Sequence, residues 1–265
     1  MRKLMKYELR CTGRIMLSIY ALTLLLGGLC ALFYALSSRY ESDFVAIFNG
    51  VLIFVFILSV IAALVLSGVI MVYRFYKNLM TDEGYLTFTL PVSTHAILLS
   101  KLLTAVIWSV STVLCALSSV FLATFQIEDI WAGLPEAWQE FLWTAGLSPS
   151  RIVLLALELA VLLLLSSVAS YLLFYAAISL GHSFSNHKIL LSVVFYFAFT
   201  TALRTITSVA ALIGGVETLP DEAFFWDVDS LLSGVLMISI GLSLIEIAGF
   251  YTLTYFMLKK RLNLQ

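Results

Sequence analysis

The chain has 265 residues, of which 62% are hydrophobic and only 12% are charged, and its mean hydropathy is +1.04. Soluble globular domains do not have this composition, so we expect a membrane protein that crosses the bilayer several times. The formal net charge of −1 says little about partners, because in such a chain the positions of the charges matter more than their sum. The three cysteines, Cys11, Cys30 and Cys115, have neither disulfide nor metal-ligand spacing.

The first segment, residues 1–14, carries basic side chains at helical spacing beside the apolar residues Leu4, Met5 and Leu9. The pattern predicts a basic amphipathic helix at the interface of an anionic leaflet. A positively charged flank that only fixes the topology explains the pattern equally well. Both interpretations place the N-terminus in the cytoplasm. The basic residues are Lys3, Lys6, Arg10 and Arg14.

Six apolar segments follow, and each is near the ~20 residues that a helix needs to cross the hydrocarbon core. None of them contains a proline, since all four prolines fall in the connections. We therefore expect an all-α membrane protein with six transmembrane helices, organised as a single transmembrane domain over residues 1–265. The predicted spans are residues 15–36, 44–73, 97–125, 152–180, 189–213 and 231–258.

Basic and acidic residues separate between the two sides of these spans. Twelve of the fifteen Lys and Arg residues fall in residues 1–14, in the connections 74–101 and 181–188, or in the tail 259–265. The remaining connections collect acidic residues instead. Because cytoplasmic loops retain Lys and Arg, both termini are predicted to be cytoplasmic.

The outer connection 126–150 is long enough to form a structure of its own. Pro135 suits the first position of a helix, and Trp131 and Trp138 recur on one side of the pattern. We expect a short helix on the outer leaflet, which serves as an anchor or, in the alternative, as an outer gate. A second outer connection, residues 214–230, has a helix start at Pro220 and is a candidate re-entrant segment.

Apart from Lys101 near the start of the third span, three charged residues fall inside the predicted spans: Glu158, Arg204 and Glu246. Charges are costly in hydrocarbon, so these side chains are expected to face the helix bundle and to pair. The helical rise places Glu158 and Arg204 at compatible depths, which predicts an ion pair between them. We interpret the pair as a tie between spans, with a proton relay or a substrate contact as the alternative.

The sequence contains no phosphate-binding loop, no zinc-protease motif and no serine-hydrolase motif. We therefore predict no catalytic residue, no metal site and no cofactor in this chain. His182 and His187, between the fourth and fifth spans, are interpreted as part of a solvated turn in which Gly181 and Asn186 supply the bends.

The stretch 74–101, between the second and third spans, is the most polar interruption of the apolar chain. Three helix-start residues are followed by Gly84 and a β-favouring run, which predicts that any helix there is interrupted. Pro91 ends the run, and Ser93 or Thr94 is expected to cap the helix that leads into the third span. The result would be a compact elbow between two long helices. The helix-start residues are Thr81, Asp82 and Glu83.

The elbow has the composition of a docking surface. Exposed Tyr85, Phe88 and Leu90 would supply apolar anchors, and Glu83 and Lys101 would supply a charged rim. The alternative is that these aromatic side chains lie in the membrane interface below the bilayer.

Two stretches of the chain resemble a known family. The run YKNLMTDEGYLTFTLPVSTHAILLSKLL and the opening KLMKYELRCTGRIMLSIY, with six spans and both ends inside, look like the ABC-2 type permeases of ATP-binding cassette transporters. The resemblance is to permeases of bacterial exporters without a fused ATPase, and it covers essentially the whole chain.

The resemblance implies a half-transporter, in which this chain and a second permease subunit, of the same or a different sequence, form the path. Separate ATPase subunits would bind ATP and Mg²⁺ and would dock on a coupling helix at residues 81–90, with Glu83, Gly84, Tyr85 and Pro91 as its motif positions. Residues 1–14 would match the family's interfacial helix.

We therefore expect a permease subunit of an exporter in a bacterial plasma membrane, with no enzymatic activity of its own and no nucleic-acid partner. Substrate would contact the first, second and fifth spans, where Phe54, Phe195 and Phe199 are candidates. Two alternatives remain. One is an ion- or proton-coupled secondary transporter that uses the three intramembrane charges, and the other is a sensor or assembly subunit through which nothing crosses.

Overall fold

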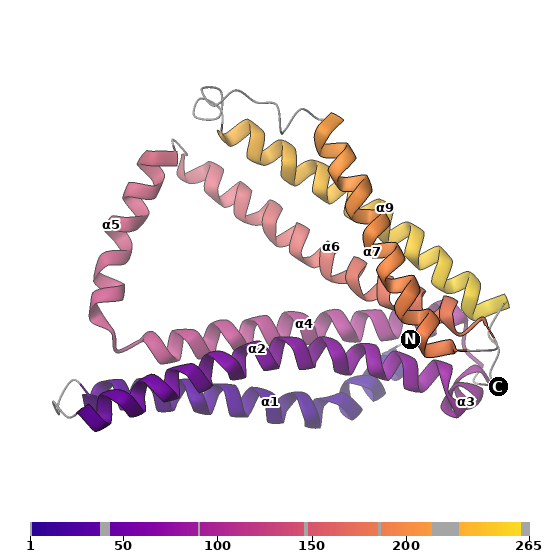
Figure 1. Ribbon diagram of the computed structural model, residues 1–265, viewed down its shortest axis with the longest axis horizontal. Helices are drawn as coiled ribbons and strands as arrows, with labels where there is room; N and C mark the ends of the chain where they lie inside the picture. Colours follow the sequence, from indigo (N-terminus) through magenta and orange to yellow (C-terminus); the bar gives the residue numbers. More distant parts are fainter. Residues whose placement is uncertain are drawn as a thin grey trace. The chain divides into compact units, whose positions relative to one another are not determined.

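The computed structural model describes residues 2–37, 43–89, 91–145, 148–184, 187–213 and 228–260. Over these ranges the regular structure is entirely helical, so the predicted all-α class is confirmed. The eight helices, drawn in Figure 1, are α1 (Arg2–Ser37), α2 (Asp43–Met80), α3 (Asp82–Thr89), α4 (Thr94–Thr124), α5 (Glu128–Ala145), α6 (Pro149–Gly181), α7 (Lys188–Ile213) and α9 (Val228–Lys260).

Six of these helices are long and apolar enough to cross a membrane, and they coincide with the six predicted spans. They are α1, α2, α4, α6, most of α7 and most of α9. The helices extend beyond the apolar cores because nothing in the flanking residues stops them. Residues 2–14, for example, are the first turns of α1 without a break, since Gly13 is the only weak helix former there and there is no proline.

Two outer features differ from the sequence interpretation or lie outside the described residues. α5 begins at Glu128, so Pro135 lies inside the helix and not at its first position. Trp131 holds this start against the end of α4, because its Nε1 donates a hydrogen bond to the carbonyl oxygen of Thr124 at 2.9 Å. The re-entrant segment expected around Pro220 lies outside the described residues.

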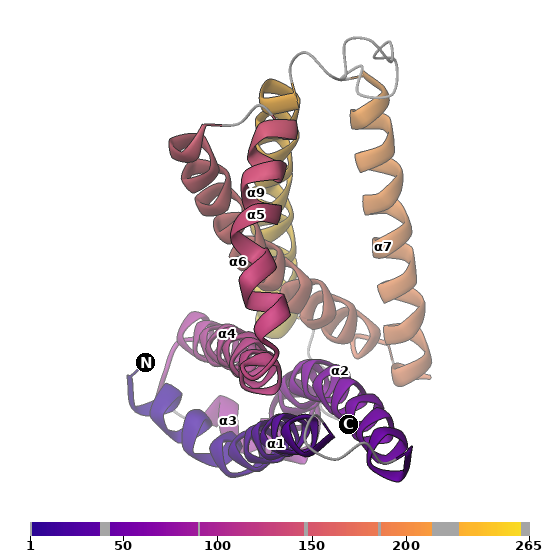
Figure 2. The same cartoon turned by 90° about the vertical axis from the view of Figure 1, so that its left-hand side faces the viewer.

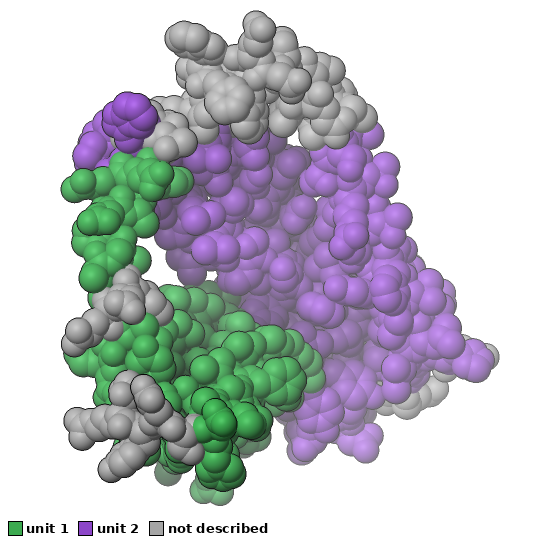
Figure 3. Space-filling model, turned by 60° about the vertical axis from the view of Figure 1, so that its left-hand side comes forward, with its two compact units in different colours: residues 1–71, 103–141 green, residues 72–102, 142–265 purple. Residues whose placement is uncertain are grey.

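The chain divides into two compact units, which Figure 3 colours separately. Unit 1 consists of Met1–Met71 and Leu103–Phe141, and unit 2 of Val72–Leu102 and Leu142–Gln265. The helices α2 and α4 each contribute to both units. The elbow between them belongs wholly to unit 2.

Polar contacts join the long helices of unit 1. The indole Nε1 of Trp108 in α4 donates to Oγ1 of Thr12 in α1 at 2.8 Å. One turn further along α4, the hydroxyl of Thr112 lies 2.8 Å from that of Tyr20 in α1 and 2.9 Å from that of Ser67 in α2. Hydrogen bonds between membrane helices are typically worth roughly 0.6–2 kcal/mol each, so these contacts help to fix the register of α1, α2 and α4.

In unit 2, α6 packs against both α7 and α9. Figure 2 shows α7 meeting α6 near the turn between them. The C-terminal part of α2 joins this group through Phe75, whose ring stacks on that of Tyr175 with centroids 3.8 Å apart. Both rings are almost fully buried, so they anchor the elbow to α6.

The turn between α6 and α7 is less solvated than predicted. The side chain of His182 is only 5% exposed, and its Nδ1 lies 2.9 Å from the carbonyl oxygen of Ile178 at the C-terminus of α6. Histidine is suited to this place because the last carbonyl groups of a helix lack partners within the helix. His187 is exposed and has a positive φ of 55°, and Asn186 lies outside the described residues.

Candidate functional site

The elbow contains a complete short helix, α3, between the end of α2 and the start of α4. The prediction that Gly84 would interrupt this helix is wrong, since α3 continues from Asp82 to Thr89. Two acidic residues in its first turn favour helix initiation. The backbone N–H of Gly84 donates to the carbonyl oxygen of Thr81 at 2.7 Å, which closes the turn that leads into the helix. These local contacts outweigh the β propensity of the residues that follow.

Three polar contacts fix α3 to the last turn of α2. Oγ1 of Thr87 donates to the carbonyl oxygen of Asn78 at 3.1 Å and thereby satisfies one of the four carbonyls that a helix end leaves unpaired. Nζ of Lys77 lies 3.2 Å from Oε1 of Glu83. Oγ1 of Thr81 donates to the carbonyl oxygen of Lys77 at 2.5 Å. The ion pair is half exposed and contributes only ~0–1 kcal/mol, so the part-buried hydrogen bond of Thr87 is the more important contact.

The outer side of α3 presents two large apolar side chains. Tyr85 is 67% exposed and Leu86 is 72% exposed, whereas Gly84 is buried. Phe88 is half-buried, so the prediction that it is a fully exposed anchor is wrong, and the sequence interpretation missed Leu86. Successive residues of a helix are turned by about 100°, so Leu86 and Phe88 lie about 160° apart around α3, and an outward Leu86 leaves Phe88 on the inner side. Pro91 is exposed, and Leu90 lies outside the described residues.

The charged residues around this surface are not the ones that were predicted. Lys101 is only 6% exposed, so its assignment to the rim is wrong. It lies seven residues inside α4, about two turns beyond the first residue, where α4 is already packed against its neighbours. Asp82 and Glu83 at the start of α3 are exposed and supply acidic groups next to Tyr85. The charged groups next to the surface are therefore Asp82 and Glu83, of which Glu83 is paired with Lys77.

The first turn of α4 is attached to the last turns of α9. Ser93 caps α4, because its Oγ accepts a hydrogen bond from the backbone N–H of Ala96 at 3.3 Å. Nδ1 of His95 lies 2.8 Å from the hydroxyl oxygen of Tyr251, and the imidazole stacks on the ring of Tyr255 with centroids 3.8 Å apart. Sequence reasoning missed this cluster. The sequence shows two tyrosines four residues apart near the end of the last span. It does not indicate that they contact His95, which lies 156 residues before Tyr251.

The intramembrane charges do not form the predicted pair. The carboxylate of Glu158 lies 3.9 Å from the guanidinium of Arg151 on the same helix, α6. Seven residues are close to two full helical turns, so the two side chains share one face of α6. Arg204 is exposed on α7 and has no ion pair with Glu158, so the predicted tie between these spans is wrong.

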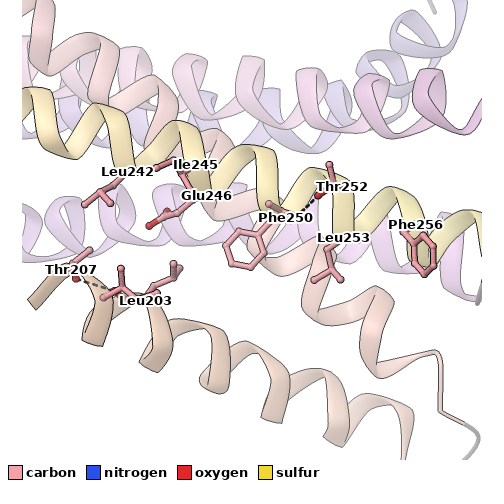
Figure 4. Close-up of a pocket in the computed structure, with 11 residues that line it drawn as sticks. Leu203, Thr207, Leu242, Ile245, Glu246, Phe250, Thr252, Leu253 and Phe256 are labelled. Carbon is pink, nitrogen blue, oxygen red and sulfur yellow. Dashed lines mark hydrogen bonds between the residues drawn. The ribbon is translucent and has the colours of Figure 1, made fainter. Parts of the chain in front are cut away.

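The third charge, Glu246 of α9, lies in a groove of about 670 Å³ between α9 and α7. Figure 4 shows its carboxylate extending from α9 toward the side of α7. Phe199 of α7 and Phe250 of α9 approach each other edge to face, with centroids 5.4 Å apart. Apart from Glu246 and two threonines, the groove is lined by apolar residues, among them Leu203, Ile206, Leu242, Ile245 and Leu253. We refer to this feature as the α7–α9 groove.

The other two aromatic candidates for a substrate path lie elsewhere. Phe195 stacks between Phe184 and Phe199 along α7, with centroid distances of 5.9 and 6.3 Å. Phe54 belongs to α2 in unit 1, where it is exposed. Of the three aromatic candidates, Phe199 is the one that contacts a residue lining the α7–α9 groove, namely Phe250.

A second groove, of about 680 Å³, lies beside the turn between α6 and α7. It is lined by Tyr76, His182, His187 and Lys188, among others. Burial lowers the pKa of His182, and the nearby positive charge of Lys188 lowers it further, against an opposing effect of the hydrogen bond to Ile178. Among the residues that the structure describes, no group of three or more His, Cys, Asp or Glu side chains could hold a metal ion.

Comparisons with protein-family models, with curated proteins and with solved structures find no match for this chain.

Proposed function

We propose that the chain is the permease subunit of an ATP-driven exporter of the ABC-2 type, and that α3 is the element on which a separate ATPase docks. The observation that carries this proposal is an eight-residue helix between two long apolar helices, with Tyr85 and Leu86 outward and its inner side fixed to α2. A helix that served only as a linker would not need two exposed apolar residues beside acidic ones.

The proposed topology places α3 in the cytoplasm, where ATP is available. Contacts within unit 2 collect the end of α2, the start of α4, the end of α6 and the end of α9 in one region (Figure 1). The basic residues of the chain concentrate in the same connections, and such residues are retained on the cytoplasmic side. Both termini would then be cytoplasmic, in a bacterial plasma membrane.

The contacts of the elbow supply a route for mechanical coupling. A displacement of α3 would move the end of α2 through the contact between Thr87 and Asn78. The same displacement would reach α9 through the first turn of α4, where His95 is held by Tyr251 and Tyr255. Closure of the ATPase subunits on ATP and Mg²⁺ would thus tilt several spans together and alternate the access of the path. A second permease subunit, of the same or another sequence, would complete that path.

The proposal is tested by isolating the chain from its native membrane in mild detergent with the ATPase that accompanies it, and by measuring ATP hydrolysis after reconstitution. The double substitution Tyr85→Ala with Leu86→Ala should remove most of the apolar contact area and reduce co-purification and hydrolysis by about tenfold or more. Trp143→Ala is the matched control, since Trp143 is 90% exposed on α5, away from the elbow. Equal hydrolysis in the double variant and in the control would contradict the proposal.

Glu246 favours a second candidate, an ion- or proton-coupled secondary transporter, because an unpaired carboxylate at membrane depth is a common coupling site. The two functions differ in their energy source. Uphill transport by the purified chain alone, driven by a pH gradient and lost in Glu246→Gln, would decide for the secondary transporter. Transport only in the presence of an ATPase and ATP would decide for the exporter.

A further inference from the structure

The α7–α9 groove contains a charged side chain, which a groove occupied only by lipid would not need. It holds one carboxylate, that of Glu246, in an otherwise apolar lining of about 670 Å³. The hydroxyl groups of its two threonines are bonded to their own helices: Thr207 donates to the carbonyl oxygen of Leu203 or Arg204, and Thr252 to that of Gly249. Glu246 is therefore the polar side chain of the groove that remains available to a ligand.

No other side chain of the described residues compensates the charge of Glu246. The described ion pairs of unit 2 join Lys77 to Glu83 and Arg151 to Glu158. Arg204, the basic residue of α7 within the membrane-spanning region, does not line the groove. A carboxylate without a partner is costly in hydrocarbon, so a positively charged ligand would gain both from the attraction and from the relief of this cost.

The residues around Glu246 suit the apolar body of such a ligand. Phe250 follows Glu246 by four residues, so both side chains lie on the same face of α9, as Figure 4 shows. An aromatic face next to a carboxylate is a favourable site for an organic cation. Between them on the helix, Gly249 lines the groove, and a Cβ added there would meet no atom within 4 Å. The groove therefore has open space beside its charge.

We propose that the α7–α9 groove is a binding site for a lipophilic organic cation, whose positive centre pairs with Glu246 and whose apolar groups contact Phe250 and the leucines of both helices. An acyl chain of a lipid would fill the volume but would leave the carboxylate uncompensated. This inference names the substrate class of the exporter proposed above, and for its physiological meaning it rests on that proposal. Binding itself requires no ATPase.

The test uses the full chain in nanodiscs of zwitterionic lipid, with tetraphenylphosphonium as the probe and tetraphenylborate as an anion of the same shape. Saturable binding of the cation but not of the anion is expected. Glu246→Gln should weaken binding of the cation by about tenfold or more, because it removes the charge and keeps the shape. Glu158→Gln is the matched control, since that carboxylate pairs with Arg151 and lies outside the groove.

A second variant tests the volume of the groove. Gly249→Leu should fill the space and weaken binding by a similar factor, and it should not unfold α9, since leucine favours helices and the added Cβ meets no neighbour. Gly241→Leu is the matched control on the same helix, because its position is equally open but does not line the groove.

Three results would overturn the inference. Equal binding of cation and anion would indicate an acyl-chain site, and unchanged cation binding in Glu246→Gln would remove the role of the carboxylate. Unchanged cation binding in Gly249→Leu together with a change of oligomeric state would assign the groove to a second copy of the chain. Cation binding without ATP-dependent transport would support the binding site and contradict the proposed exporter. ATP-dependent transport that is unaffected by Glu246→Gln would support the exporter and contradict the binding site.

Discussion

At the scale of single residues, two glycines have a packing role that the sequence alone does not indicate. Gly27 is an ordinary apolar position in the sequence, but in α1 it faces the backbone of α4. Gly181 was interpreted as a flexible bend, yet a Cβ there would lie 2.5 Å from the backbone nitrogen of Ser192 in α7. Glycine is required at both positions because of close helix approach, a known feature of membrane helices.

Gly27→Ala should destabilise unit 1. The added Cβ would lie 2.7 Å from the carbonyl oxygen of Ser119, a rigid backbone atom, so α1 and α4 must separate at a cost of about 1–3 kcal/mol. The measurement is thermal unfolding of the purified chain in detergent. Gly68→Ala in α2 is the control, since its Cβ would meet nothing within 4 Å, and it should be neutral or slightly stabilising. An equal effect of both substitutions would contradict the close approach.

His182 should make stability depend on pH. Its pKa is lowered in the folded chain by burial and by Lys188, below the value of about 6.5 expected in the unfolded chain. As the pH falls through about 6.5, the unfolded chain binds a proton that the folded chain does not, so stability is full above this pH and declines below it. Unfolding temperatures measured between pH 8 and pH 5 should fall less steeply for His182→Gln than for the native chain. A slope that is unchanged in His182→Gln would contradict this role of His182.

At the scale of elements, α3 has a different kind of attachment from the long helices. The spans of unit 2 are joined by ring stacking and apolar packing, as between Phe75 and Tyr175. α3 is instead attached by hydrogen bonds and one half-exposed ion pair at the end of α2. An element with few buried apolar contacts opens locally at low cost, which suits a helix that must adjust to a partner.

Thr87→Val should loosen α3 and leave the spans intact. The substitution removes the hydrogen bonds to the carbonyl oxygens of Asn78 and Glu83, worth about 1 kcal/mol, and keeps the shape of the side chain. Hydrogen exchange of the amides in α3 should accelerate by about fivefold, since 1 kcal/mol corresponds to this factor. Thr89→Val is the matched control on the same helix, because Thr89 donates only to Leu86 within α3. Identical exchange in the two variants would contradict the attachment.

At the scale of the whole molecule, the features set by the bilayer were predictable and those set by tertiary contact were not. The six spans followed from hydropathy, because the thickness of the hydrocarbon core fixes the length of an apolar helix. The elbow predicted within residues 74–101 is shorter in the structure, where α2 ends at Met80 and α4 begins at Thr94, and the local signals of Pro91 and Ser93 mark the start of α4. Hydropathy gives no information on which faces meet, however, so the burial of Lys101 was missed.

The candidate sites show the same division. Tyr85 was recognised from composition because an exposed aromatic between charges is a local pattern. The predicted partner of Glu158 was wrong, since the prediction matched Arg204 by depth and did not consider Arg151, which shares a face of the same helix with Glu158. The association of His95 with Tyr251 joins residues that are 156 positions apart in the sequence and has no local signal.

The central claim is that an ATPase contacts the outer face of α3, and site-specific photocrosslinking tests it most directly. A photoreactive phenylalanine analogue would be placed at Leu86, and in a parallel sample at Trp143, which is similarly exposed but lies on α5. The account predicts a crosslink from position 86 to a chain with a nucleotide-binding phosphate loop, increased by ATP, and none from position 143. A crosslink from position 86 to lipid alone, in membranes that contain the complete transporter, would contradict it.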